Sequence, residues 1–104
     1  MYGLVVRFEL KDETSAAEFD QLTVETGRGI AEYEPGTLVY VTHLVEGAPL
    51  ARVFYEVYRD REAFEEHERQ PHILRFLAER RNYVSSVRVE FISPVTVKGL
   101  TTDL

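Results

Sequence analysis

Residues 37–58 read TLVYVTHLVEGAPLARVFYEVY, and this stretch decides the fold. It contains two runs rich in Val, Leu, Tyr and Phe, residues 37–45 and 51–58, on either side of a turn at residues 46–49. β-Branched and aromatic residues favour strands, whereas Gly and Pro mark turns. The stretch therefore predicts a β-hairpin in the middle of the chain.

A strand and a helix are predicted before this hairpin. Residues 3–10 alternate between apolar and polar side chains, as a strand with one buried face does. Thr14 or Ser15 can cap the helix that follows. Gly27 and Gly29 weaken the second half of this helix, so we expect a break or kink there.

A helix and a strand are predicted after the hairpin. Asp60 can cap the helix. Its inner stripe is expected to contain Phe64, His67, Pro71 and Leu74. Pro71 lacks an amide donor, so it should kink or restart the helix. A fourth strand is expected from residue 85 or 86 to residue 97, with an interruption at Pro94.

The predicted order is β-α-β-β-α-β, the α+β arrangement called ferredoxin-like, with an antiparallel sheet and both helices on one sheet face. Such a sheet should alternate cleanly between apolar and polar residues if its other face met water. Residues 38–41 and 53–55 are instead apolar at successive positions. We therefore expect a second copy's sheet to cover that face, which predicts a homodimer. Residues 1–104 form one domain in this prediction, with residues 98–104 as a short, polar, peripheral tail.

The composition excludes several classes of function. With 12 Lys and Arg against 18 Asp and Glu, the net charge is -6, which argues against nucleic acid because phosphates require clustered cations. The sequence has no cysteine, which removes disulfides and thiolate chemistry and suits a reducing cytoplasm. No apolar run is long enough for a membrane span, and Arg7 comes too soon for a signal peptide. We expect a cytoplasmic protein.

Polar residues inside apolar stretches are the candidates for a site. They are Arg7, Glu56, Tyr58, His67 and His72. Arg7 and Glu56 fall on strands that are neighbours in a ferredoxin-like sheet. They can form a cross-strand ion pair that only stabilises the sheet, or the charged floor of a pocket for an anionic substrate. Tyr58 shares the sheet face of Glu56, where a tyrosine also serves as a packing residue.

The two histidines flank the expected break at Pro71. A single inward histidine is usually a structural residue, but two beside one helix break suggest contact with a ligand, because neutral imidazole shuttles protons near pH 7. Their spacing of five residues across a break is not a zinc pattern. The nearby carboxylates should face solvent; they are Glu65, Glu66 and Glu68. We expect no metal site.

Three segments resemble the antibiotic biosynthesis monooxygenase family. They are residues 34–38 (EPGTL), 54–60 (FYEVYRD) and 63–72 (AFEEHERQPH). The resemblance covers nearly the whole chain and implies a dimeric α/β barrel, in which each subunit has a pocket between its sheet and its helices. It also implies that this pocket is lined or braced by Glu56, Tyr58, His67 and His72.

Members of that family oxidise quinols or polyketide-like aromatics with O₂ and no cofactor, whereas others degrade haem or isomerise small metabolites. Haem-degrading relatives place a Trp on the second helix, and this chain has no Trp, which disfavours haem degradation. The leading hypothesis is a cofactor-independent monooxygenase acting on a small, electron-rich aromatic such as a quinol or anthrone. Its partners would be this substrate, O₂ and a second copy of the chain, with no nucleic acid and no membrane.

In this hypothesis, His72 or His67 is the general base, and His72 is preferred because it opens a helix segment beside the break. Arg7 stabilises the developing anion, and Tyr58 orients a substrate oxygen. The apolar walls are Phe54, Phe64 and Phe76. Two alternatives stay open: an isomerase, cyclase or decarboxylase that uses the same histidine, and a non-catalytic dimeric binding module whose pocket its own side chains fill.

Overall fold

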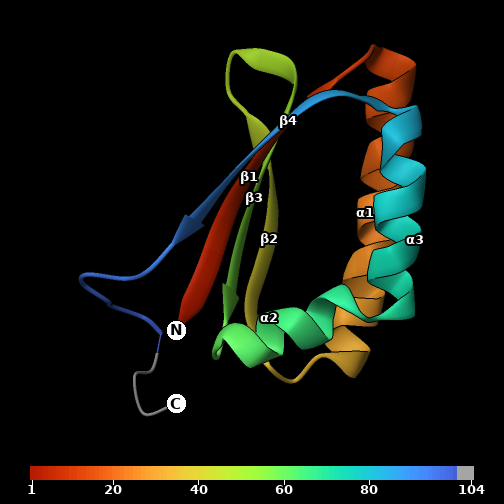
Figure 1. Cartoon of the computed structure of the whole chain (residues 1–104). Helices are drawn as coiled ribbons and strands as arrows, with labels where there is room; N and C mark the ends of the chain where they lie inside the picture. The colour runs from red at the N-terminus through yellow and green to blue at the C-terminus, as the bar shows by residue number, and fades with distance from the viewer. Residues whose placement is uncertain (101–104) are drawn as a thin grey trace.

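The computed structural model describes residues 1–100, and this part of the chain forms a four-stranded antiparallel sheet in the order β2-β3-β1-β4. Helices α1 and α3 lie side by side along one face of the sheet, and α2 crosses one end (Figure 1). The elements are β1 (Tyr2–Leu10), α1 (Glu13–Tyr33), β2 (Thr37–Val45), β3 (Ala48–Tyr58), α2 (Arg61–Glu68), α3 (Pro71–Glu79), the 3-10 helix η1 (Arg80–Asn82) and β4 (Val84–Ile92). The predicted ferredoxin-like α+β fold is confirmed.

The hairpin of β2 and β3 is tighter than its sequence predicted. Gly47 adopts a φ of 79°, a left-handed conformation that glycine reaches without steric cost. Pairing therefore resumes at Ala48, opposite Val45, and β3 begins three residues before the predicted Ala51. Strand β4 ends at Ile92, short of the predicted residue 97, so that Pro94 lies outside the sheet.

Helix α1 is continuous, so the predicted break at Gly27 and Gly29 is wrong. Each glycine costs a helix only about 1 kcal/mol. The helix buries a full stripe against the sheet, consisting of Ala16, Phe19, Leu22, Thr23, Thr26 and Ile30, and this burial outweighs the two glycines. The helix is capped by Asp12, whose carboxylate accepts a hydrogen bond from the Ser15 amide at 2.7 Å, and not by Thr14 or Ser15.

The second helical region is divided as predicted. Asp60 caps α2 by accepting a hydrogen bond from the Ala63 amide at 2.8 Å. Pro71 occupies the first turn of α3, where its missing amide proton has no helical partner to lose. The restart changes which residues face inward: Ile73 and Phe76 are buried, whereas the predicted Leu74 is 55% exposed.

Four phenylalanines join the helices to the sheet. Phe8 and Phe54 come from neighbouring strands, Phe19 comes from α1 and Phe76 from α3, and their ring centroids lie 4.8 to 6.2 Å apart. Rings at these separations contribute beyond the area that they bury. This cluster holds α1 and α3 near one end of the sheet, while α2 lies at the other end.

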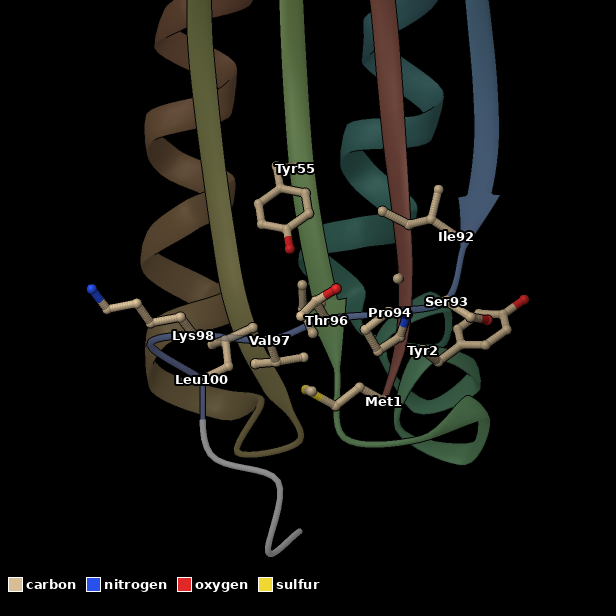
Figure 2. A pocket seen from close by; sticks show the side chains of 12 residues that line it. Met1, Tyr2, Tyr55, Ile92, Ser93, Pro94, Thr96, Val97, Lys98 and Leu100 are labelled. Carbon is tan, nitrogen blue, oxygen red and sulfur yellow. The ribbon is translucent and has the colours of Figure 1, made fainter.

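Within residues 1–100, no helix lies on the other face of the sheet (Figure 1). Val5, Tyr55 and Val41 lie at paired positions across three strands of this face, and Val41 is 43% exposed. The segment after β4 crosses part of the face and encloses a cavity of about 190 Å³ with Tyr55 and Val57 (Figure 2). Within the predicted tail, Lys98 and Leu100 line this cavity, and residues 101–104 lie outside the described part. None of the helices in residues 1–100 is long and apolar enough to cross a membrane.

Candidate functional site

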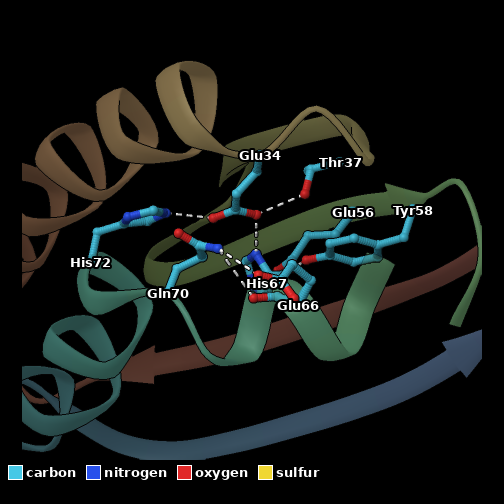
Figure 3. A network of polar contacts seen from close by, with 8 residues as sticks. All are labelled: Glu34, Thr37, Glu56, Tyr58, Glu66, His67, Gln70 and His72. Carbon is cyan, nitrogen blue, oxygen red and sulfur yellow. Dashed lines mark hydrogen bonds and ion pairs between the residues drawn. The ribbon is translucent and has the colours of Figure 1, made fainter. Parts of the chain in front are cut away.

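The candidate site is built around a glutamate at the end of α1. Glu34 caps the helix through its own amide, which donates to the Ile30 carbonyl at 3.1 Å, and its side chain is almost fully enclosed. The Glu34 carboxylate accepts a hydrogen bond from the Thr37 hydroxyl at 2.7 Å. It also contacts His67 Nδ1 at 2.6 Å and His72 Nε2 at 2.5 Å (Figure 3). One buried carboxylate therefore joins α1, α2 and α3.

The two histidines flank the interruption at Pro71, as predicted, and their imidazoles meet at one carboxylate. His67 lies in the last turn of α2 and His72 in the first turn of α3, and the rings approach the two oxygens of Glu34 separately. An ionised carboxylate can only accept hydrogen bonds, so both histidine nitrogens that face it are donors. In neutral His67 this leaves Nε2 as the nitrogen that can accept a proton.

The electrostatics distinguish the two buried glutamates. Burial raises the pKa of Glu34, but the hydrogen bonds from His67, Thr37 and His72 outweigh it, so the pKa lies below its usual value. For Glu56 the burial dominates and raises the pKa, although Tyr58 donates a hydrogen bond to its carboxylate. Glu56 Oε1 lies 3.8 Å from His67 Nε2. His67 is therefore held between a readily ionised carboxylate and one that is harder to ionise.

A cavity of about 170 Å³ lies between the sheet and the helices, beside His67. It is lined by Leu4, Val6, Phe8, Tyr40, Phe54, Glu56, Phe64, His67, Glu68, Ile73, Phe76, Leu77, Arg80, Val89 and Phe91. His67 also lines a second, more polar cavity of about 340 Å³ with Glu34, Thr37 and Gln70. The imidazole thus lies in the wall that separates an apolar space from a polar one. His72 lines neither of these two cavities.

Most of the residues expected at the site come together in this region. The apolar cavity is lined by His67, Glu56, Phe54, Phe64 and Phe76, whereas His72 reaches the site only through Glu34. The predicted role of Tyr58 in orienting a substrate does not fit its position. Its side chain is 0% exposed, it does not line the cavity, and its hydroxyl is occupied by Glu56.

The expected partnership of Arg7 and Glu56 is wrong. Arg7 lies opposite Val53 on the helix-free face of the sheet and donates to Glu9 at 2.7 Å. Glu56 lies opposite Leu4 and faces the helices. Successive residues of a strand point to opposite faces, so Arg7 and Leu4 cannot share one. Within this chain, Arg7 can neither pair with Glu56 nor stabilise an anion in the cavity.

Four polar residues that line or brace the site were not among the predicted ones: Glu34, Tyr40, Glu68 and Arg80. In the sequence, Glu34 stood out only as the first residue of the family-like segment 34–38. Its position does carry a signal, because an acidic side chain at the C-terminal end of a helix meets the negative pole of the helix dipole. A glutamate there calls for compensating donors, and the two histidines and Thr37 provide them.

In residues 1–100, no three His, Asp or Glu side chains are arranged to hold a metal ion.

The fold and the cavity beside His67 define a ferredoxin-like domain with a ligand-sized space between sheet and helices. Residues 1–79 match the family model for antibiotic biosynthesis monooxygenases. Because the match covers more than half of the chain, the protein belongs to that family. No curated protein matches the chain in sequence.

Solved structures with the same fold include three from different bacteria. A protein of Bacteroides thetaiotaomicron, described as an antibiotic biosynthesis monooxygenase, is 21% identical with a TM-score of 0.84, over 96% of this chain and 94% of its own. A protein of Mycobacterium tuberculosis is 22% identical with a TM-score of 0.84, over 92% of this chain and 96% of its own. A variant of SnoaB, a cofactor-independent oxygenase of Streptomyces nogalater, is 19% identical with a TM-score of 0.81, over 95% of this chain and 97% of its own.

Proposed function

We propose that the protein is a cofactor-independent monooxygenase that oxidises a small, electron-rich aromatic with O₂. The observation that carries this proposal is the setting of His67. Glu34 binds His67 Nδ1 at 2.6 Å, and His67 also lines the apolar cavity. A carboxylate bound to one imidazole nitrogen fixes the orientation and the tautomer of the ring, as a general base requires. His67 replaces His72 as the preferred base, because His72 does not line that cavity.

The reaction needs only a base, O₂ and a substrate that can supply electrons. His67 Nε2 takes a proton from a ring hydroxyl, and the resulting phenolate passes one electron to O₂. The substrate radical and superoxide combine into a carbon-bound peroxide. Its O–O bond then breaks, and one oxygen stays on the ring as a carbonyl. The other leaves as water with the proton that the base returns and the hydrogen lost from the same ring carbon. For a quinol the balance is quinol plus O₂ giving hydroxyquinone plus water.

The cavity supports a small substrate. Its volume of about 170 Å³ slightly exceeds that of an engineered cavity of about 150 Å³ that binds benzene. This favours a quinol of one or two rings over a three-ring anthrone. The relative SnoaB, a cofactor-independent oxygenase, supports chemistry without a cofactor.

The active protein in this proposal is a cytoplasmic homodimer. The helix-free face carries half-exposed apolar side chains such as Val41 and Tyr55, and the segment after β4 covers only part of it. A second sheet packed on this face would bury them. The absence of cysteine suits the cytoplasm.

The proposal is tested by oxygen uptake in metal-free buffer with reduced benzoquinones and naphthoquinones. His67→Ala should lower turnover about 10²–10⁴-fold, the usual effect of losing a general base. His72→Ala is the matched control, because it removes the other imidazole on Glu34 without touching the cavity wall, so its loss of turnover should be smaller. Circular dichroism must show that both variants are folded.

Two results would count against this function. If wild type consumes no oxygen with any quinol but converts an aromatic ligand by isomerisation or decarboxylation, the same histidine serves a reaction without oxygen. If folded His67→Ala keeps wild-type turnover, His67 is not the base.

A further inference from the structure

A cationic side chain lies in the wall of the apolar cavity. Arg80 follows the last turn of α3 and lines the cavity together with Phe8, Leu77 and Val89. Its guanidinium carbon lies 5.8 Å from the centroid of the Phe8 ring, and Phe8 is only 1% exposed. The half-buried cation therefore rests on the aromatic core instead of extending into solvent.

Arg80 has no hydrogen-bond acceptor or carboxylate for its guanidinium within residues 1–100. The well-buried Arg52, in contrast, is held by both oxygens of Asp20, at 2.8 and 3.0 Å. Even the exposed neighbour Arg81 donates to the Ala78 carbonyl at 3.1 Å. Burial lowers the pKa of Arg80, the direction expected for a cation that loses water without gaining an anion. A partly desolvated guanidinium with five donors is the side chain best suited to bind a carboxylate from outside the chain.

The charges of the cavity are arranged at two ends. Glu56 pairs with Leu4 of β1, and Phe8, which lies under Arg80, is four residues further along the same strand. Four residues of strand span about 13 Å. Glu56 and Glu68 line one end of the cavity with His67, and Arg80 lines the other (Figure 1 shows α3 running away from α2 along the sheet). An anionic ligand would be repelled at the first end and attracted at the second.

We propose that Arg80 binds an anionic substituent, such as a carboxylate, of the aromatic ligand, and that the substrates of this cavity are therefore aromatic acids. The inference rests on the proposed function only in taking this cavity as the ligand site. The planar guanidinium can bind a carboxylate through two parallel hydrogen bonds. With the acid group fixed at Arg80, the opposite edge of the ring is directed toward His67, so the cation sets the orientation of the substrate.

The test measures binding and involves no oxygen. Titration calorimetry compares 1-naphthoate with 1-naphthamide, which has a similar shape and no charge. Wild type should bind the acid about ten- to a hundredfold more tightly, as expected for hydrogen bonds to a charged group. Arg80→Gln should abolish this preference, whereas Arg81→Gln, the same change at the adjacent exposed position, should keep it. If Arg80→Gln does not fold, Arg80→Met preserves the apolar stem over Phe8 and should also abolish the preference.

Salt provides a second readout on the unaltered protein. Raising the ionic strength should weaken binding of the acid and leave binding of the amide unchanged. Equal affinities of wild type for the two compounds, no binding of either, or a preference that survives in folded Arg80→Gln would overturn the inference. A wild type that prefers the acid but consumes no oxygen with any quinol would instead contradict the proposed function and leave the role of Arg80 intact.

Discussion

The strongest test of the site's architecture is a pair of identical substitutions two residues apart in α1. Gly29 faces α3, and a Cβ atom added there would lie 2.5 Å from His72 Cγ and 2.9 Å from His72 Cβ. Such distances are shorter than any real contact, and His72 Cβ cannot swing away as the end of a long side chain can. A Cβ at Gly27 would meet nothing within 4 Å. Gly27→Ala and Gly29→Ala therefore share one effect on the helix and differ in their effect on His72.

The magnitude follows from that difference. Both substitutions raise the free energy of unfolding by about 1 kcal/mol, because alanine favours the helix over glycine by this amount. Gly29→Ala must in addition either strain the packing, which costs about 1–3 kcal/mol, or turn His72 away from Glu34, which loses a hydrogen bond to a charged group worth about 1.5–3 kcal/mol. We expect Gly27→Ala to be about 1–3 kcal/mol more stable than Gly29→Ala, a melting-temperature difference on the order of 10 °C.

The assay is thermal and urea denaturation followed by circular dichroism, at one protein concentration for wild type and both variants. Equal protein concentration matters because a dimer's apparent stability depends on it. If Gly29→Ala is as stable as Gly27→Ala, the packing of His72 against α1 is not as described, and the junction at Glu34 would have to be revised.

The remaining predictions concern the buried carboxylates and the assembly. The pKa of Glu34 is lowered by folding, so its contribution to stability is present above the ordinary value of 4.5 and is lost as the pH falls through the folded value. Glu34→Gln should therefore destabilise the protein at pH 7. In urea titrations, the stability of this variant should also fall less steeply than that of wild type as the pH is lowered. The pKa of Glu56 is raised, so its ionisation opposes folding as the pH rises; the stability of Glu56→Gln relative to wild type should increase from pH 4 to pH 8, and a decrease would contradict the burial argument. Sedimentation at micromolar concentration should show a dimer, and a stable monomer would leave the helix-free sheet face unexplained.

The sequence predicts those parts of the fold that depend on local chemistry. The strand pattern of residues 37–58 fits only a hairpin, and the missing amide of Pro71 fits only the start of a helix. The structure has both features. Glycine in a helix has two possible structural consequences, because it can end the helix or make room for a neighbouring side chain. Gly29 makes room for a neighbour, and only the position of His72 shows this. This information lies 43 residues away in the sequence, where no local pattern reaches it.

The site is harder to predict because strand register decides which face a residue occupies. In β1 the alternation of residues 4–10 already places Arg7 opposite the apolar set. In β3, however, successive residues are apolar, so the pattern does not show on which face Glu56 lies until Leu4 is known to pair with it. The roles of Glu34 and Arg80 likewise depend on contacts between elements that are distant in the chain.

The position of His67 between two cavities has a consequence for the order of events in a turnover. A ring that takes up a proton on its Nε2 side can give up the proton on its Nδ1 side to Glu34, which borders the polar cavity. The proton would then lie on the polar side of His67, while the substrate stays on the apolar side. The substrate anion and its proton would then be held on opposite sides of one imidazole ring while O₂ reacts, and the same transfer in reverse would return the proton when water is released.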